Sequence, residues 1–184
     1  MLKEIYHKLE KARARYNNQD MFAGDTYGQI SAEGTERLIK IFSESFQDPQ
    51  GVFYDLGCGP GHMVMHIALA TSLNKSVGIE LHEARYNLGI ETLNKLKTKY
   101  KDKAFDKVEI RMEDLNDTDL SDATIIYVDN TVFRKKVSDL IYQKAPKGCL
   151  LISARQFSAV KEYPARTKMI SRNYNNNGVW WTIK

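Results

Sequence analysis

Three glycines at alternate positions follow an apolar run that carries an acid. Residues 52–61 read VFYDLGCGPG, and an apolar pattern at helical spacing runs on from Met63 to Leu73. This order predicts a strand, a tight turn and a helix. Glycine lets a backbone turn sharply and approach a ligand with no Cβ in the way. Because a helix also begins with unpaired N–H groups and a positive dipole end, the stretch predicts a cradle for a nucleotide-type ligand.

The spacing of the glycines indicates which ligand the cradle holds. A dinucleotide site has the order G-x-G-x-x-G, whereas here Gly61 comes one residue early and His62 stands at the dinucleotide position. The carboxylate of Asp55 would repel a pyrophosphate but receive an ammonium group. S-adenosylmethionine carries an α-amino group and no phosphate, so it is the predicted cofactor. The residues of the turn predicted to bind it are Asp55, Gly57, Cys58, Gly59 and Gly61.

The next two predicted strands also end in acids. Glu80 closes residues 76–81 and is placed to accept hydrogen bonds from both ribose hydroxyls. After residues 108–113, Asp114 is placed to accept from the adenine exocyclic amine, and Leu115 is expected to lie on the ring. A helix-capping role for Asp114 is the alternative.

The fourth predicted strand, residues 123–129, leads into the methyl acceptor. Ligands bind at the carboxyl ends of parallel strands, so Asp129 and Asn130 are expected to face the transferred methyl group and accept an N–H from an amine. Amide-directed and adenine-directed N-methyltransferases carry two prolines at this place, and no proline follows here until Pro146. These two chemistries are therefore disfavoured.

Aromatic residues are candidates for the walls of the acceptor channel. Free lysine has a pKa near ~10.4, so a dry apolar channel helps by favouring the neutral amine. Ring faces also hold cationic groups, and the candidates are Tyr27, Phe133, Trp180 and Trp181. Since successive strand residues face opposite ways, at most one tryptophan lines the channel. Tyr27 is alternatively a turn residue packed on the core.

Strands and helices alternate from Gly51 onward, which predicts an α/β fold with a mostly parallel seven-stranded sheet and a C-terminal antiparallel hairpin. A single compact domain is expected, with N-terminal helices and a cofactor-covering loop in 1–50 and the core in 51–184. The predicted strands are 52–57, 76–81, 108–113, 123–129, 148–154, about 167–173 and 179–183. The predicted helices are 1–17, 32–46, 61–73, 82–102 and 132–144.

Bulk composition indicates an intracellular protein. The 184 residues are 42% hydrophobic, with no run of membrane-spanning length and no signal-peptide pattern at the N-terminus. Cys58 and Cys149 both fall in predicted buried strands and are expected to be reduced, and no metal site is expected.

Net charge is +4, and the densest basic run is in the predicted helix 82–102 and just after it. The run is either a solvated helix face or a contact for nucleic acid or chromatin. Its members are Lys95, Lys97, Lys99, Lys101 and Lys103.

The order of the motifs resembles the non-SET histone-lysine methyltransferases of the disruptor-of-telomeric-silencing type. The segments that carry the resemblance are Tyr27-Gly28-Gln29, Asp55 to Gly61, Gly78-Ile79-Glu80, Glu113-Asp114-Leu115, Asp129-Asn130-Thr131-Val132-Phe133 and Trp180-Trp181-Thr182-Ile183. The resemblance implies a Rossmann-like class I methyltransferase fold and methylation of a lysine on a histone or another basic protein.

The resemblance also implies roles for individual residues. It adds Tyr27, Gln29 and Asp129 to the cofactor site, and the acceptor residues it implies are Asn130, Asp129, Tyr27 and Phe133. This chain departs from the family pattern at three positions. Ile30 stands where Thr is usual, Asp129 where Asn is usual, and Leu115 where an aromatic is usual. An RNA or small-molecule methyltransferase and a non-catalytic binding module of the same fold remain the alternatives.

Overall fold

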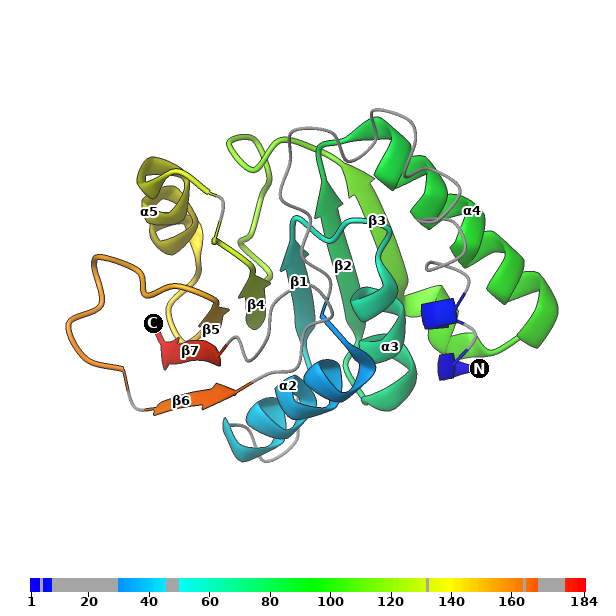
Figure 1. The fold of residues 1–184 in the computed structure, drawn as a ribbon, viewed down its shortest axis with the longest axis horizontal. Helices are drawn as coiled ribbons and strands as arrows, with labels where there is room; N and C mark the ends of the chain where they lie inside the picture. The colour runs from blue at the N-terminus through cyan, green and yellow to red at the C-terminus, as the bar shows by residue number, and fades with distance from the viewer. Residues whose placement is uncertain (4, 8–29, 46–49, 132, 164, 169–177) are drawn as a thin grey trace.

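One twisted sheet organises the protein. The computed structural model describes residues 1–3, 5–7, 30–45, 50–131, 133–163, 165–168 and 178–184. Seven strands lie in the order β3-β2-β1-β4-β5-β7-β6 (Figure 1). The first five strands in chain order are parallel, and β7 runs antiparallel to both β5 and β6. The strands are β1 (Val52–Leu56), β2 (Lys75–Glu80), β3 (Val108–Met112), β4 (Ile125–Val128), β5 (Leu150–Ser153), β6 (Ala165–Lys168) and β7 (Gly178–Ile183).

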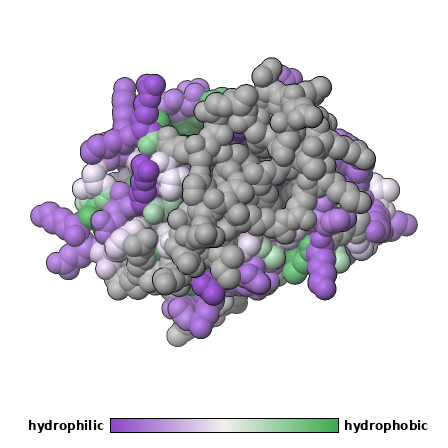
Figure 2. All heavy atoms as spheres, in the orientation of Figure 1, coloured by the Kyte–Doolittle hydropathy of each residue, from purple (hydrophilic) through white to green (hydrophobic). Residues whose placement is uncertain are grey.

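Helices cover both faces of the sheet. The first face carries α2 (Ala32–Ser45), α3 (His62–Ala70) and α4 (Glu83–Tyr100), and the second carries α5 (Lys135–Lys144). Successive residues of β1 show the division, because Phe53 packs with α2 and α3 while Tyr54 packs with α5. Figure 2 shows the molecular surface in the same view. Hydrophilic side chains lie around the edge of the visible face, and the hydrophobic ones form small separate patches. Near-continuous apolar strands thus mean burial on both faces, as the sequence predicts.

The predicted α/β class and the C-terminal antiparallel pair are confirmed, whereas several boundaries differ. The helix predicted over 82–102 ends at Tyr100, and a short 3-10 helix that the sequence did not predict, η1 (Lys103–Lys107), leads into β3. The helix predicted from residue 132 begins at Lys135. The strand predicted near 167–173 is observed at 165–168, and residues 169–177 lie outside the described part.

Both cysteines are buried free thiols, as expected, but neither lies in a strand. Cys58 lies in the turn after β1, and Cys149 directly precedes β5. No helix in the described part of the chain combines the length and apolar character needed to cross a membrane.

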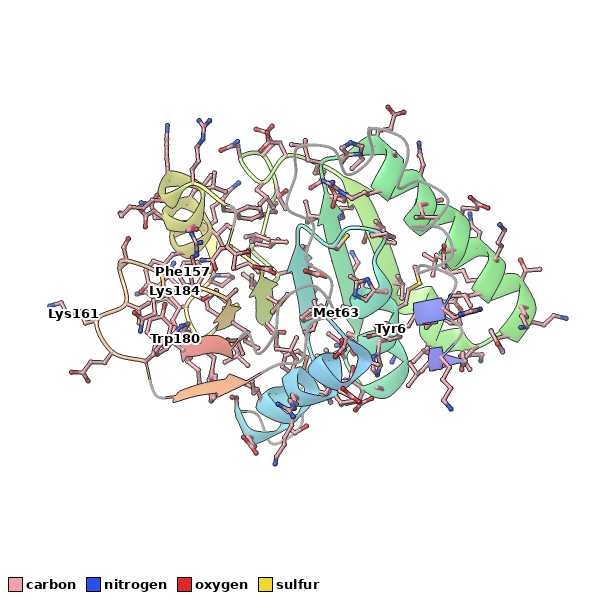
Figure 3. All side chains as sticks on the ribbon, in the orientation of Figure 1. Tyr6, Met63, Phe157, Lys161, Trp180 and Lys184 are labelled. Atoms are coloured by element: carbon pink, nitrogen blue, oxygen red, sulfur yellow. The ribbon has the colours of Figure 1, made fainter. Side chains whose placement is uncertain are left out.

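A buried polar network joins the N-terminal helical residues to the core. The Tyr6 hydroxyl lies 2.9 Å from His66 Nδ1 and 3.0 Å from Thr35 Oγ1, and His66 Nε2 lies 2.7 Å from the exposed Glu36 carboxylate. Figure 3 shows Tyr6 beside α3. His62, one turn before His66, is buried with Nε2 3.2 Å from the Ile30 carbonyl oxygen. The network therefore fixes α2, α3 and the residues before them to one another.

Acid should destabilise the fold through His62. Burial, and then the nearby His66, lower the pKa of His62 from 6.5 to about 4, against a smaller opposing effect of the Ile30 carbonyl. Between these pH values the unfolded chain binds more protons, so the free energy of unfolding falls as the pH falls. The loss from this group should reach about 3 kcal/mol near pH 4 and then stop. Chemical denaturation from pH 7 to pH 4 measures it.

His62→Gln should flatten that pH dependence, since glutamine keeps a side-chain N–H for the Ile30 carbonyl and does not titrate. His7→Gln, at an exposed histidine, is the matched control and should keep the wild-type slope. An unchanged slope in His62→Gln would contradict the assignment.

Candidate active site

The glycine turn after β1 has backbone angles that other residues would adopt only with strain. Gly57, Gly59 and Gly61 have φ angles of +87°, +55° and +75°, all in the left-handed region. The N–H groups of Gly57 and Cys58 both donate to the Ile79 carbonyl at 2.9 Å, which ties the turn to β2. A Cβ at Gly57 would also lie 3.4 Å from the Phe133 ring. The predicted cradle is therefore present, and Phe133 lies beside it.

Cys58 supports the turn from beneath. A Cβ at Gly78 would lie 2.6 Å from Cys58 Sγ, so the thiol packs directly on the glycine of β2. Burial, followed by the charges of Asp55 and Glu80, raises the pKa of Cys58 well above its usual value. The thiol therefore stays protonated, and its side chain is a packing group.

The carboxylate of Glu80 lies at the end of β2, as predicted, but protein donors already surround it. Oε2 accepts from the Gly59 N–H at 2.9 Å, while Oε1 accepts from the His82 N–H at 2.8 Å and from Arg85 Nη2 at 2.9 Å. Since a carboxylate has about four acceptor positions, Glu80 has one left. Binding both ribose hydroxyls thus requires Arg85 to share or leave Oε1. Arg85 was not a predicted site residue, because its pairing with Glu80 needs the turn into α4.

Asp55 is a buried carboxylate in a negative environment. It is 5% exposed, and among the described residues none donates a hydrogen bond to its carboxylate. Its pKa is raised well above the usual value, first by burial and then by the charges of Glu80 and Asp129. A cationic ligand would relieve this repulsion. The environment therefore fits the ammonium of an amino-acid moiety, as the sequence predicts.

The two polar residues that follow β4, Asp129 and Asn130, make different contacts. Asp129 Oδ1 accepts from the Thr131 N–H at 3.2 Å and from the Thr131 hydroxyl at 2.6 Å. Asn130 instead is 2% exposed and holds the loop that follows β5. Its Nδ2 donates to the Arg155 carbonyl at 3.1 Å, and its Oδ1 accepts from the Arg155 N–H at 2.7 Å. The Asn130 amide is thus largely engaged by the Arg155 backbone, whereas Asp129 Oδ2 accepts no hydrogen bond from the described residues. Contact of either residue with an acceptor amine stays a prediction.

Asp114 and Leu115, which are expected to contact the adenine, follow the end of β3. Asp114 Oδ1 accepts from the backbone and side-chain nitrogens of Asn116, at 2.8 and 2.7 Å, so it caps a local turn. Leu115 is partly buried against the α5 face of the sheet. Leu81 and Met112, at the ends of β2 and β3, are instead 67% and 51% exposed. An apolar residue directly after the acid of β2 was the sequence signal for this surface.

The two tryptophans of β7 face opposite sides of the sheet, as predicted. Trp181 packs against the α2 and α3 core, whereas the Trp180 ring lies 5.6 Å from the Tyr163 ring. Figure 3 shows Trp180 and Phe157 at the β5 and β7 end of the sheet, away from Tyr6. The predicted site residues Tyr27 and Gln29 lie outside the described residues.

The lysine run lies far from the glycine turn. Helix α4 begins at the carboxyl edge of the sheet and extends for 18 residues, about 27 Å at 1.5 Å per residue. Lys95 pairs with Glu91, and Lys99 lies over the Tyr100 ring, both in the last turns of α4. Nucleic-acid contact through these lysines stays a prediction, and it concerns the opposite edge of the sheet. Among the residues the structure describes, none form a group suited to hold a metal ion.

The strand order, the glycine turn after β1 and the acid at the end of β2 together define a class I methyltransferase fold. Similar solved structures include an RNA methyltransferase from Salinibacter ruber in complex with S-adenosyl-L-homocysteine, with a TM-score of 0.63, 19% identity, and coverage of 84% of this chain and 92% of that one. The rRNA methyltransferase aviRa from Streptomyces viridochromogenes has a TM-score of 0.59 and 11% identity, covering 96% and 95%. At such identities the likeness shows the fold alone.

The chain belongs to the DOT1 family of histone methylation proteins, whose model matches residues 6–183. It is 42% identical over 66 residues, 36% of its length, to a histone-lysine N-methyltransferase, H3 lysine-79 specific, of Caenorhabditis elegans. The Drosophila melanogaster protein of the same description is 22% identical over 187 residues, 97% of this chain. The chain spans only 7% and 10% of the length of these two relatives.

Asn130→Ala should act through stability. The substitution leaves the N–H and carbonyl of Arg155 without partners, which should lower the free energy of unfolding by about 1–3 kcal/mol. Asn87→Ala, at an exposed position of α4, is the control and should stay within about 0.5 kcal/mol of wild type. Urea denaturation measures the stability of both variants. Equal stabilities of Asn130→Ala and wild type would contradict this role of Asn130.

Proposed function

We propose that this chain is an S-adenosylmethionine-dependent protein-lysine N-methyltransferase that acts on a histone or another basic protein. The observation that carries the proposal is the buried Asp55, which lies beside the glycine turn and near the charges of Glu80 and Asp129, and against which the described residues place no cationic side chain. Family membership supports the reaction class, and the names of the two relatives support the histone as substrate.

Residues along the carboxyl edge would hold the cofactor. Asp55 receives the ammonium of the methionine moiety, the turn from Gly57 to Gly61 lies against it without Cβ atoms, and Glu80 accepts from the ribose. The exposed Leu81 offers an apolar surface to the adenine ring. When bound, S-adenosylmethionine would supply a methyl carbon on a sulfonium: the lone pair of a neutral amine would form the N–C bond as the C–S bond breaks, with S-adenosylhomocysteine as the leaving group. Contacts from Asp114, Leu115, Tyr27 and Gln29 remain predictions.

Asp129 would orient the acceptor. Its Oδ1 is held by Thr131, which leaves Oδ2 to attract a lysine side chain and accept one N–H of the neutral amine. The Phe133 ring beside Gly57 supplies an apolar wall that favours the neutral form. Positioning of this kind supplies roughly 7–11 kcal/mol of a barrier, so the site needs no separate base.

A protein acceptor is favoured over RNA by the distribution of charge. Asp129 puts a carboxylate where the acceptor approaches, which attracts an amine and repels a phosphate backbone. The lysines suited to nucleic acid begin at Lys95, about 18 Å along α4 from the start of this helix at the carboxyl edge of the sheet. Location at chromatin follows only if the substrate is a histone.

The proposal is tested in two stages. Calorimetry should first show that the purified chain binds S-adenosylhomocysteine, and binding of NAD or ATP alone would overturn it. The chain is then incubated with labelled S-adenosylmethionine and either histone octamers, nucleosomes or total RNA, with mass spectrometry of the products. Methyl groups on lysine are expected, while methyl groups only on RNA or a small molecule would reject the lysine acceptor.

Asp55→Asn separates binding from folding. Loss of the charge should weaken S-adenosylhomocysteine binding about 10- to 100-fold, the value of a charge-assisted hydrogen bond. Adenosine, which lacks the amino-acid moiety, should bind within about twofold of wild type. The free energy of unfolding of the ligand-free protein should rise, because a buried charge beside two other carboxylates has been removed.

Asp106→Asn, an exposed change in η1, is the matched control and should leave all three quantities unchanged. Equal weakening of both ligands by Asp55→Asn would contradict the assigned role.

A further inference from the structure

One row of residues crosses the sheet from the cofactor end to the acceptor end. Asp55 of β1 is the register partner of Tyr127 of β4, which is in turn the partner of Ile152 and, beyond it, Trp181. Neighbouring strands lie about 4.8 Å apart. Asp129 follows Val128, the last residue of β4, and lies near enough for its charge to act on Tyr127. Tyr127 thus stands between the two carboxylates assigned to cofactor and acceptor.

The Tyr127 hydroxyl is not used by any residue that the structure describes. Tyr127 is only 6% exposed, and no described residue forms a hydrogen bond with its hydroxyl. Four fully buried side-chain atoms in the described part lack a partner, and the hydroxyl is not among them, so it still reaches solvent. A buried tyrosine usually finds a partner for its hydroxyl, as Tyr54 on the neighbouring strand does with Asp122 at 2.8 Å. The lack of a partner among the described residues therefore indicates that this hydroxyl contacts a ligand.

The surroundings keep this hydroxyl neutral. Burial, then the charges of Asp129 and Asp55, raise the pKa of Tyr127 well above 10. A neutral phenol keeps its proton and offers an oxygen that accepts a hydrogen bond. That oxygen can accept an N–H from a neighbouring group, and a neutral amine is such a donor.

Resting on the lysine methyltransferase function proposed above, we propose that Tyr127 is a further catalytic residue whose hydroxyl oxygen contacts the acceptor amine. A neutral primary amine has two N–H groups and one lone pair. Tyr127 accepts one N–H and Asp129 Oδ2 accepts the other. With both N–H groups held, the lone pair is aimed at the transferred methyl group. Tyr127 belongs to β4, whose four residues are all buried, and Asp129 directly follows Val128, the last residue of that strand.

The arrangement also favours addition of a single methyl group. A monomethylated amine retains one N–H in its neutral form, so it satisfies only one of the two acceptors. Turning the new methyl group toward either acceptor leaves a polar oxygen facing carbon. Monomethyllysine is therefore the expected main product.

Tyr127→Phe tests the inference because it removes one oxygen and keeps the ring in the core. With histone octamers as substrate, the variant should lower kcat about 3- to 10-fold, the effect of one neutral hydrogen bond. The dissociation constant for S-adenosylhomocysteine should stay within about twofold of wild type. Mass spectrometry should show a higher ratio of dimethyllysine to monomethyllysine.

Tyr54→Phe is the matched control, since it removes a hydroxyl from a buried tyrosine of β1 that faces α5. It should lower stability and leave kcat and the methylation ratio unchanged. An unaltered kcat in Tyr127→Phe would overturn the inference. So would a loss of S-adenosylhomocysteine affinity that matches the fall in kcat, because the hydroxyl would then serve the cofactor.

Failure of the proposed function is visible separately. Wild-type protein that binds no S-adenosylhomocysteine, or that transfers no methyl group to histone lysine, would overturn both proposals before any variant is compared.

Discussion

Buried negative charge at the carboxyl edge of the sheet is the constraint on which the rest of this structure depends. Asp55, Glu80 and Asp129 lie close enough to raise the pKa of Asp55, yet Arg85 is the one cation that the described residues place against any of them. The sheet core holds the three strand ends in place despite their repulsion, and two apolar layers supply the free energy to do so. A cationic ligand completes a site that the protein alone leaves unbalanced.

The part of the site that is local in sequence could be predicted from the sequence. The strand, the three glycines and the acid of β2 lie within 29 residues and follow rules of backbone conformation and strand ends. Asn130 could not be assigned in this way, because its partner Arg155 is 25 residues away and contributes only backbone atoms. Tyr127 reads as one more apolar residue of a buried strand. Its free hydroxyl becomes visible only when the register places it beside Asp55.

On the function proposed above, the cofactor and the acceptor are held by different residues. The solved structures that share this architecture include RNA methyltransferases, so the fold alone does not decide the acceptor. In this chain the proposed acceptor residue lies after β4, where Thr131 donates two hydrogen bonds to one oxygen of the Asp129 carboxylate. A few side chains at one strand end would then select the acceptor.

The pair of hydrogen bonds between Asn130 and the Arg155 backbone has an evolutionary consequence. Because it engages only the N–H and carbonyl of residue 155, any amino acid except proline can occupy that position and still be held. The exposed side chain there is consequently free to change while the loop keeps its place. Lineages can diversify this exposed loop position in this way without losing the hydrogen bonds that hold the loop.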